Sequence, residues 1–201
     1  MAYSDFSLEE VIDKFELVEK RAKLFDHVET LEMSDWLKET FADSLDLGLF
    51  SSSEKARSEF IVVPILLEIK KRTSKNIAIH SGKRLNAHPE KGLNGECDFI
   101  LSKGEISYTI QTPIFALVEA KKNDIDLGVG QCAAQMVGAK IINQRQGNDI
   151  STIFGCSTTG EDWQFLKLEA DAICLDRDRY YIDNVGQILG MLQNVIDFYE
   201  S

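Results

Sequence analysis

The sequence predicts an α/β protein in which a mixed central sheet is flanked by helices. Three observations lead to this fold class. Three successive strand-like segments lie between residues 77 and 121, a helix rich in small residues follows them, and further strands lead into a C-terminal amphipathic helix. The chain has 201 residues, which suits a single domain and is long enough to bury a hydrophobic core.

The first fifty residues predict a helical N-terminal extension. Ser7 and Glu10 have the spacing of a capping box, and the apolar residues after them recur at helical intervals, which predicts a helix over 8–23. A second short helix is expected after Ser34, closing near Gly48. We expect the extension and the main domain, residues 51–201, to form one compact unit.

The segment SSSEKARSEFIVVPILLEIKKRTSKN opens the main domain. Its apolar centre also suits a buried strand, but its length and charged flanks favour a helix that Pro64 bends or restarts. The β-branched and aromatic content that follows, with Gly, Asn and Pro between the segments, predicts three strands over 77–85, 96–102 and 112–121.

The second half of the chain predicts one helix, several strands and a closing helix. The helix spans 128–146 and ends at Gly147, and a strand over 151–159 follows. WQFLKLE and DAICL predict two more strands, RYYID a short edge, and QILGMLQNVIDFY an amphipathic helix. The core order of the main domain is therefore helix, three strands, helix and strand.

The composition indicates a soluble, globular protein. The sequence is 44% hydrophobic and 27% charged, without an apolar run of 18 residues, and no membrane partner is expected. Its start, MAYSDFSLEE, lacks the basic and apolar regions of a signal peptide, so we expect a cytoplasmic location. The four cysteines lie among apolar neighbours without metal-ligand spacing, which favours buried reduced thiols over a redox site.

Charge is distributed unevenly along the chain. The formal net charge of −11 argues against binding nucleic acid through bulk electrostatics. Residues 1–50 hold thirteen acidic and five basic residues, whereas residues 65–91 hold seven basic and two acidic ones. Such blocks are usually solvated faces, but a basic strip beside an acidic site would meet phosphates. Lys83 and Arg84 of this strip are candidate phosphate contacts, together with Lys122 and Gln135.

An acid and an amine end the apolar segment FALVEAKK. Glu119 and Lys121 are two residues apart, so a strand would place both side chains on one face. Glu68 and Lys70 have the same Glu-x-Lys pattern, but on a helix their side chains point roughly 200° apart. The pair at 119 and 121 is either a solvated strand end or part of a site.

Asp98, at the start of the preceding strand, would complete such a site. Adjacent strands lie about 4.8 Å apart, so the Asp98 carboxylate can approach that of Glu119. Two carboxylates this close repel unless something neutralises them, and Mg²⁺ does so while leaving positions for water and phosphate oxygens. Lys121 would then orient or activate a water and offset charge on a phosphate.

Three further residues are candidates for this site. Glu59 would add a carboxylate from the neighbouring helix, with Glu54 as a weaker substitute. Gln131 and Gln135 are four residues apart and share one helical face, from which they can hydrogen-bond a water, a phosphate or a metal-bound ligand.

Together these residues resemble the PD-(D/E)xK nuclease superfamily, which has the restriction-endonuclease-like fold. The stretches ARSEFIVVPIL, GECDFIL, LVEAKK, GVGQCAAQM and TTGEDWQFLKL are similar to small bacterial members, and the resemblance covers about residues 53–175. Cys97 stands where the motif has its proline. The first fifty residues and the last helix are unmatched.

The resemblance implies cleavage of DNA that depends on Mg²⁺, with Mn²⁺ as a substitute. Asp98 and Glu119 would bind the metal, Lys121 would assist the water, Glu59 would be an accessory acid and Gln131 a polar contact from the helix. Two alternatives stay open. The superfamily includes members that no longer cut, which would make this chain a nucleic-acid-binding or protein-binding module, and residues 1–50 would also suit a homodimer contact or a partner-docking surface.

Overall fold

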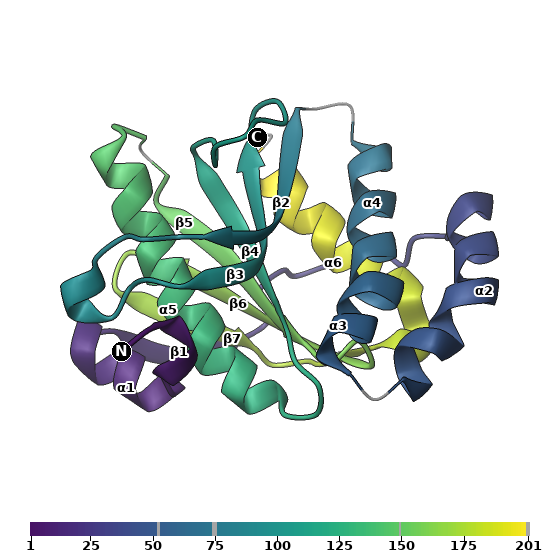
Figure 1. Ribbon diagram of the computed structural model, residues 1–201, viewed down its shortest axis with the longest axis horizontal. Coiled ribbons are helices and arrows are strands. Elements are labelled where there is room, and N and C mark those ends of the chain that lie inside the picture. The colour runs from purple at the N-terminus through teal and green to yellow at the C-terminus, as the bar shows by residue number, and fades with distance from the viewer. Residues whose placement is uncertain (52, 74–75, 149, 200–201) are drawn as a thin grey trace.

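The protein is built around an eight-stranded mixed sheet with helices on both faces, as the computed structural model shows (Figure 1). The structure describes residues 1–201 except 52, 74–75, 149 and 200–201. The predicted α/β class with a mixed sheet between helices is therefore confirmed.

Strands far apart in the sequence lie side by side in this sheet. The strands are β1 (Val18–Ala22), β2 (Ile77–Arg84), β3 (Glu96–Lys103), β4 (Ile114–Ala120), β5 (Thr152–Thr158), β6 (Asp162–Glu169), β7 (Ala172–Asp176) and β8 (Tyr180–Tyr181). Their order is β1-β7-β6-β5-β4-β3-β2, with β8 paired to β6. Only the β1–β7 and β4–β5 pairs are parallel within the described residues. The strands predicted from residue 77 onward are all present.

Helices cover the two faces of the sheet as separate layers. The helices are α1 (Leu8–Phe15), α2 (Asp35–Phe50), α3 (Glu54–Arg57), α4 (Val63–Arg72), α5 (Ile125–Arg145) and α6 (Val185–Phe198). One apolar cluster joins α1 and α5 to the sheet, and another joins α2, α4 and α6 to its opposite face. In Figure 1, α5 and the N-terminal helix accordingly lie apart from α4 and α2.

The predicted helix after residue 51 is present, but it contains a wider turn. A π-helical segment, Ser58–Val62, connects α3 to α4, and the amide of Val63 bonds the carbonyl of Ser58 five residues earlier. Pro64 lies in the first turn of α4, directly after this wider turn, and has no amide to donate to it. A π-turn rotates the residues that it contains relative to a regular helix, and one of those residues is Glu59.

The helix predicted over 8–23 is wrong in its second half. Ser7 and Glu10 do form the expected capping box, but α1 ends at Phe15 because Glu16 adopts the left-handed conformation, with φ 53° and ψ 43°. Val18–Ala22 instead forms β1 and pairs in parallel with β7. Helix propensity is a weak preference, and the free edge of β7 offers this segment backbone hydrogen bonds that local periodicity cannot reveal. The N-terminal fifty residues are thus not wholly helical.

The remaining helices follow the predictions closely. The second helix was expected after Ser34, and α2 has Ser34 as its N-cap. The helix expected over 128–146 begins at Ile125, because the Asp124 side chain accepts hydrogen bonds from the amides of Asp126 and Leu127. All four cysteines are buried and free, as predicted.

Candidate functional site

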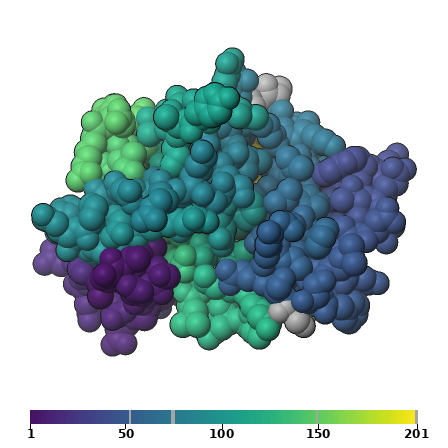
Figure 2. Space-filling view, in the orientation of Figure 1, coloured from purple at the N-terminus to yellow at the C-terminus, as the bar shows by residue number. Residues whose placement is uncertain are grey.

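The candidate site lies where β3 begins and β4 ends. In the register between these antiparallel strands, Phe99 faces Val118, so Asp98 comes opposite Glu119 one position further along. All seven residues of β4 are buried. Glu119, next to the last residue of the strand, therefore lies in the interior. Figure 2 shows the surfaces of β2–β3 and of α2–α3 side by side, with the start of α5 between them at the lower edge.

Glu119 is held by an amine and an amide. Its side chain is 1% exposed. Lys121 donates from Nζ to Oε1 at 2.8 Å, and Gln135 of α5 donates from Nε2 to Oε2 at 2.7 Å. The expected convergence of Glu119 and Lys121 at the end of a strand is therefore found in the structure. The comparison pair behaves as its helical position predicts, since Glu68 bonds Ser34 and Arg72 instead of Lys70.

Asp98 brings a second carboxyl group against Glu119. Asp98 Oδ2 accepts a hydrogen bond from the amide of Ala120 at 2.8 Å, and its side chain is within hydrogen-bonding reach of the Glu119 carboxyl. Burial, and then the charge of Asp98, raise the pKa of Glu119 to about 7, against the lowering effects of Lys121 and Gln135. Burial also raises the pKa of Asp98. The two acids thus share a site that resists holding two negative charges.

Lys121 stays charged in this environment. Burial alone would lower the pKa of its amine, but the charge and hydrogen bond of Glu119 raise the pKa above its ordinary value, with smaller contributions from Glu54 and Asp98. Close packing keeps the amine in place. A Cβ added at Gly128 of α5 would lie 2.9 Å from Lys121 Cγ and 2.2 Å from Ser157 Oγ, so only a glycine admits this approach.

A cleft of about 350 Å³ opens beside Asp98. It is lined by three more acids, Glu54 and Glu59 from the α3 and π-helical segment and Glu96 from β3. The Glu59 side chain is 53% exposed and lies 3.7 Å from Lys55 Nζ, so it borders the cleft from a solvent-exposed position. Asp98 is the member of the carboxyl pair that the cleft reaches.

The structure brings some predicted residues together and leaves others apart. Asp98, Lys121 and Gln135 each contact Glu119. Gln131 is 8% exposed, but within the described residues its side chain forms no hydrogen bond, so the helix-borne contact to Glu119 comes from Gln135 instead. The two glutamines do share a face, but Gln135 lies one helical turn further along α5 and is the one that reaches Glu119.

Of the four predicted phosphate contacts, Gln135 is buried and bonded to Glu119, whereas the three basic residues lie at the surface around this region. Lys122 follows the site directly and is exposed. Lys83 of β2 is half-buried and donates to the carbonyl of Tyr108 at 3.3 Å, whereas the exposed Arg84 pairs across the strands with Glu96. All three can accept an anion without breaking a buried interaction.

Glu96 was missed by the sequence reasoning. It is two residues before Asp98 on the same strand, so the rule that grouped Glu119 with Lys121 would also have placed Glu96 beside Asp98. Glu54 was ranked below Glu59, yet Glu54 is the acid whose charge acts on Lys121. The π-helical segment rotates Glu59 relative to Glu54, and the periodicity of a regular α-helix does not predict this rotation.

The donor set fits a divalent cation of the magnesium type. Among the described residues, no group of three or more His, Cys, Asp and Glu side chains has metal-ligand geometry. Mg²⁺, however, is commonly bound through one or two carboxylates, with waters and substrate phosphates completing its shell. Asp98 and Glu119 are two such carboxylates. Burial raises the pKa of both, and a bound cation would favour their ionised forms.

Comparison of the sequence with models of known protein families and with curated proteins gives no match. Among the described helices, none is long and apolar enough to cross a membrane.

Proposed function

We propose that this protein is a metal-dependent nuclease that hydrolyses phosphodiester bonds in DNA, with a restriction-endonuclease-like fold of the PD-(D/E)xK type. The observation that carries the proposal is the meeting of Asp98, Glu119 and Lys121 at the ends of two neighbouring strands. The chain order of α4, β2–β4, α5 and β5 supports it, because it is the helix, three strands, helix and strand of that fold.

Each residue has a chemical role in this proposal. Asp98 and Glu119 would hold Mg²⁺, which would supply positive charge against the scissile phosphate and lower the pKa of a bound water. Lys121 keeps its proton and places a fixed positive charge beside Glu119, where it orients the attacking water and offsets charge developing on the phosphate. Gln135 holds the Glu119 carboxyl in position from α5, so it is a positioning residue.

The residues around the cleft would guide the substrate. Glu59 and Glu54 line the cleft beside Asp98, where they would bind waters of the metal shell or a second cation. Lys122, Lys83 and Arg84 would neutralise phosphates outside it, which offsets part of the repulsion from a chain of net charge −11. Gln131 would contact the substrate only if it moves from its buried position.

A direct test measures cleavage of single-stranded and double-stranded DNA with Mg²⁺ or Mn²⁺. We expect Asp98→Asn, Glu119→Gln and Lys121→Met each to lower the rate by at least about a hundredfold, because each removes a charge at the reacting phosphate. Lys70→Met is the matched control. Lys70 follows Glu68 by two residues, as Lys121 follows Glu119, but it lies on the helix α4 and not at the candidate site. Equal cleavage by the wild type and the three site variants would contradict the proposal.

A non-cleaving module for binding nucleic acid or protein is the second candidate. It is favoured by the hydrogen bonds that already occupy both carboxylate oxygens of Glu119. Calorimetric titration with Mn²⁺, in the presence and absence of DNA, separates the two functions. A nuclease site binds the ion and loses it in Glu119→Gln, whereas an inactive module binds none in either protein.

A further inference from the structure

We infer that a basic cleft beyond the end of β1 and β7 binds the sugar–phosphate backbone of the nucleic acid, outside the candidate catalytic site. The cleft has a volume of about 710 Å³. Arg21 and Lys23 form one wall at the end of β1, and Arg177 and Arg179 form the other in the turn after β7. The choice of nucleic acid as ligand rests on the proposed function.

The cleft is positive in a protein that is strongly negative overall. Its four Arg and Lys side chains are accompanied by two acids, Asp26 and Asp178, and by His27. These residues leave a local excess of two positive charges, while the chain as a whole has a formal charge of −11. Such a concentration of cations attracts an anion that the rest of the surface repels.

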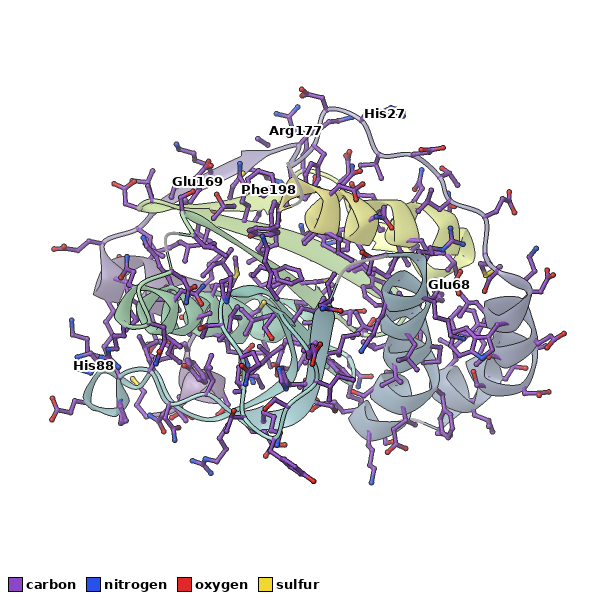
Figure 3. The ribbon with its side chains drawn as sticks, turned by 90° about the horizontal axis from the view of Figure 1, so that it is seen from above. His27, Glu68, His88, Glu169, Arg177 and Phe198 are labelled. Carbon is purple, nitrogen blue, oxygen red and sulfur yellow. The ribbon has the colours of Figure 1, made fainter. Side chains whose placement is uncertain are left out.

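Two of the four cations are available to a ligand. Arg21 and Arg177 are exposed, and neither forms an ion pair within the part of the chain that the structure describes. Lys23 makes a long, exposed contact of 3.7 Å with Asp178, which contributes little to stability and is readily exchanged for a phosphate. Figure 3 labels His27 and Arg177, which lie close together near the end of β1.

Arg179 is fixed in place at the junction between the cleft and the candidate site. Its Nε donates to Oε1 of the buried Gln164 at 3.2 Å, and its guanidinium lies 3.2 Å from Asp126 in the first turn of α5. Asp126 follows Lys121 by five residues. The wall of the basic cleft is therefore in contact with the helix that starts at the catalytic edge.

The sheet places both sites along one edge. β1 is parallel to β7 and β4 is parallel to β5, while two antiparallel steps through β6 give β5 and β7 the same direction. The carboxyl ends of β1, β4, β5 and β7 therefore lie together. Four strand spacings separate β4 from β1, which is about 19 Å, or the length of about six base pairs along a duplex.

This separation favours a polymer over a small ligand. A mononucleotide could fill the basic cleft but would not reach Asp98 and Glu119. A nucleic-acid backbone presents phosphates at regular intervals along its length, so one strand can occupy both places. The cleft then positions the substrate while the acids and Lys121 act on the scissile bond.

Binding of fluorescently labelled DNA in EDTA tests this proposal without requiring cleavage. We compare a 20-base-pair duplex with a hairpin whose stem has only 4 base pairs, by fluorescence anisotropy across a series of salt concentrations. Arg21→Gln combined with Arg177→Gln should weaken binding of the long DNA by about tenfold or more and reduce the magnitude of the salt slope by about 2, because two phosphate contacts are lost. The short DNA should bind the wild type much more weakly than the long DNA, because it cannot occupy the cleft and the candidate catalytic site at the same time.

The control is a double variant with the same loss of charge elsewhere, Lys38→Gln with Lys91→Gln, both of which are exposed. It should bind as the wild type does. The proposal is overturned if the two double variants bind the long DNA alike, or if the wild type binds the short DNA as tightly as the long DNA. Circular dichroism confirms that both variants fold.

The outcome for the cleft is separable from that for the catalytic site. If no DNA is cut with any metal while binding still depends on Arg21 and Arg177, the cleft is supported and the nuclease proposal fails. If DNA is cut and the arginine variant has the wild-type affinity and salt slope, the nuclease proposal is retained and the cleft is rejected.

Discussion

The fold buries the carboxyl group of Glu119 beside the amine of Lys121, the amide of Gln135 and the carboxyl group of Asp98. Burial and the charge of Asp98 raise the pKa of Glu119 to about 7, whereas its ordinary value is 4.5. An acid with this pKa exchanges its proton near neutral pH, and the site therefore changes charge within the physiological range. A cation bound between Asp98 and Glu119 would favour the ionised form.

This raised pKa predicts how stability depends on pH in the metal-free protein. Between pH 4.5 and about 7 the folded state binds a proton that the unfolded state has released, so the free energy of unfolding falls as the pH rises. Over this window the wild type should lose up to about 3 kcal/mol relative to Glu119→Gln, which cannot ionise. Urea denaturation in EDTA at several pH values measures the difference.

Two parallel stability profiles would show that Glu119 does not titrate as described. Adding Mn²⁺ above pH 7 provides a further check, because an ion that binds only the folded state stabilises it. The wild type should gain stability with the ion, and Glu119→Gln should gain little.

At the scale of elements, a buried carboxylate joins two helices on the other side of the molecule. Glu68 of α4 is 1% exposed and accepts hydrogen bonds from the amide and hydroxyl of Ser34, the N-cap of α2. Arg72 donates to the same carboxylate from the next turn of α4. Figure 3 labels Glu68 on α4, beside α2. This one side chain therefore fixes how α2 begins.

Glu68→Gln should lower the free energy of unfolding by about 2–3 kcal/mol at pH 7, because it leaves Arg72 and Ser34 with a weaker acceptor. Burial alone would raise the pKa of Glu68, but the hydrogen bonds from Ser34 and Arg72 lower it below the ordinary value of 4.5. The stabilisation is therefore present above pH 4.5 and is lost as the pH falls through the lowered pKa. Urea denaturation at pH 7 and pH 3 measures both effects.

The exposed Glu39 of the same pair of helices provides the control. Glu39→Gln should change stability by less than about 0.5 kcal/mol. A Glu68 variant as stable as this control at pH 7 would mean that the carboxylate does not anchor α2.

At the scale of the whole molecule, the N-terminal residues are part of the fold. Tyr3, Phe6 and Val11 are buried in the apolar cluster that joins α1 and α5 to the sheet, and β1 extends the sheet beside β7. Both indole side chains, Trp36 and Trp163, belong to the cluster on the opposite face. Fluorescence from these residues thus reports on the face opposite to the one that residues 3–11 cover.

Phe6→Ala should lower the free energy of unfolding by about 3–4 kcal/mol, because it removes a buried ring and leaves a cavity. If the molecule unfolds as one cooperative unit, tryptophan fluorescence and far-ultraviolet circular dichroism will shift by the same amount. Phe50→Ala is the matched control, since Phe50 is 78% exposed. A fluorescence transition that stays at its wild-type midpoint in Phe6→Ala would show that the N-terminal segment is an independent appendage.

What the sequence alone determined was local. The strands around Asp98 and Glu119, the helix after them and the convergence of Glu119 with Lys121 follow from periodicities of two and 3.6 residues, which neighbouring residues encode. The helical character of residues 54–72 likewise followed from the length and flanks of that segment.

Only the tertiary structure decided which distant residues meet. It made Val18–Ala22 a strand because β7 has an open edge, selected Gln135 over Gln131 through the packing of α5, and brought Glu96 and Glu54 to the cleft. It also brought Arg21 and Arg177 into one basic cleft, although they are 156 residues apart in the sequence. Strand register and helix packing depend on long-range contacts, and the periodicity of a single segment holds no record of its partner.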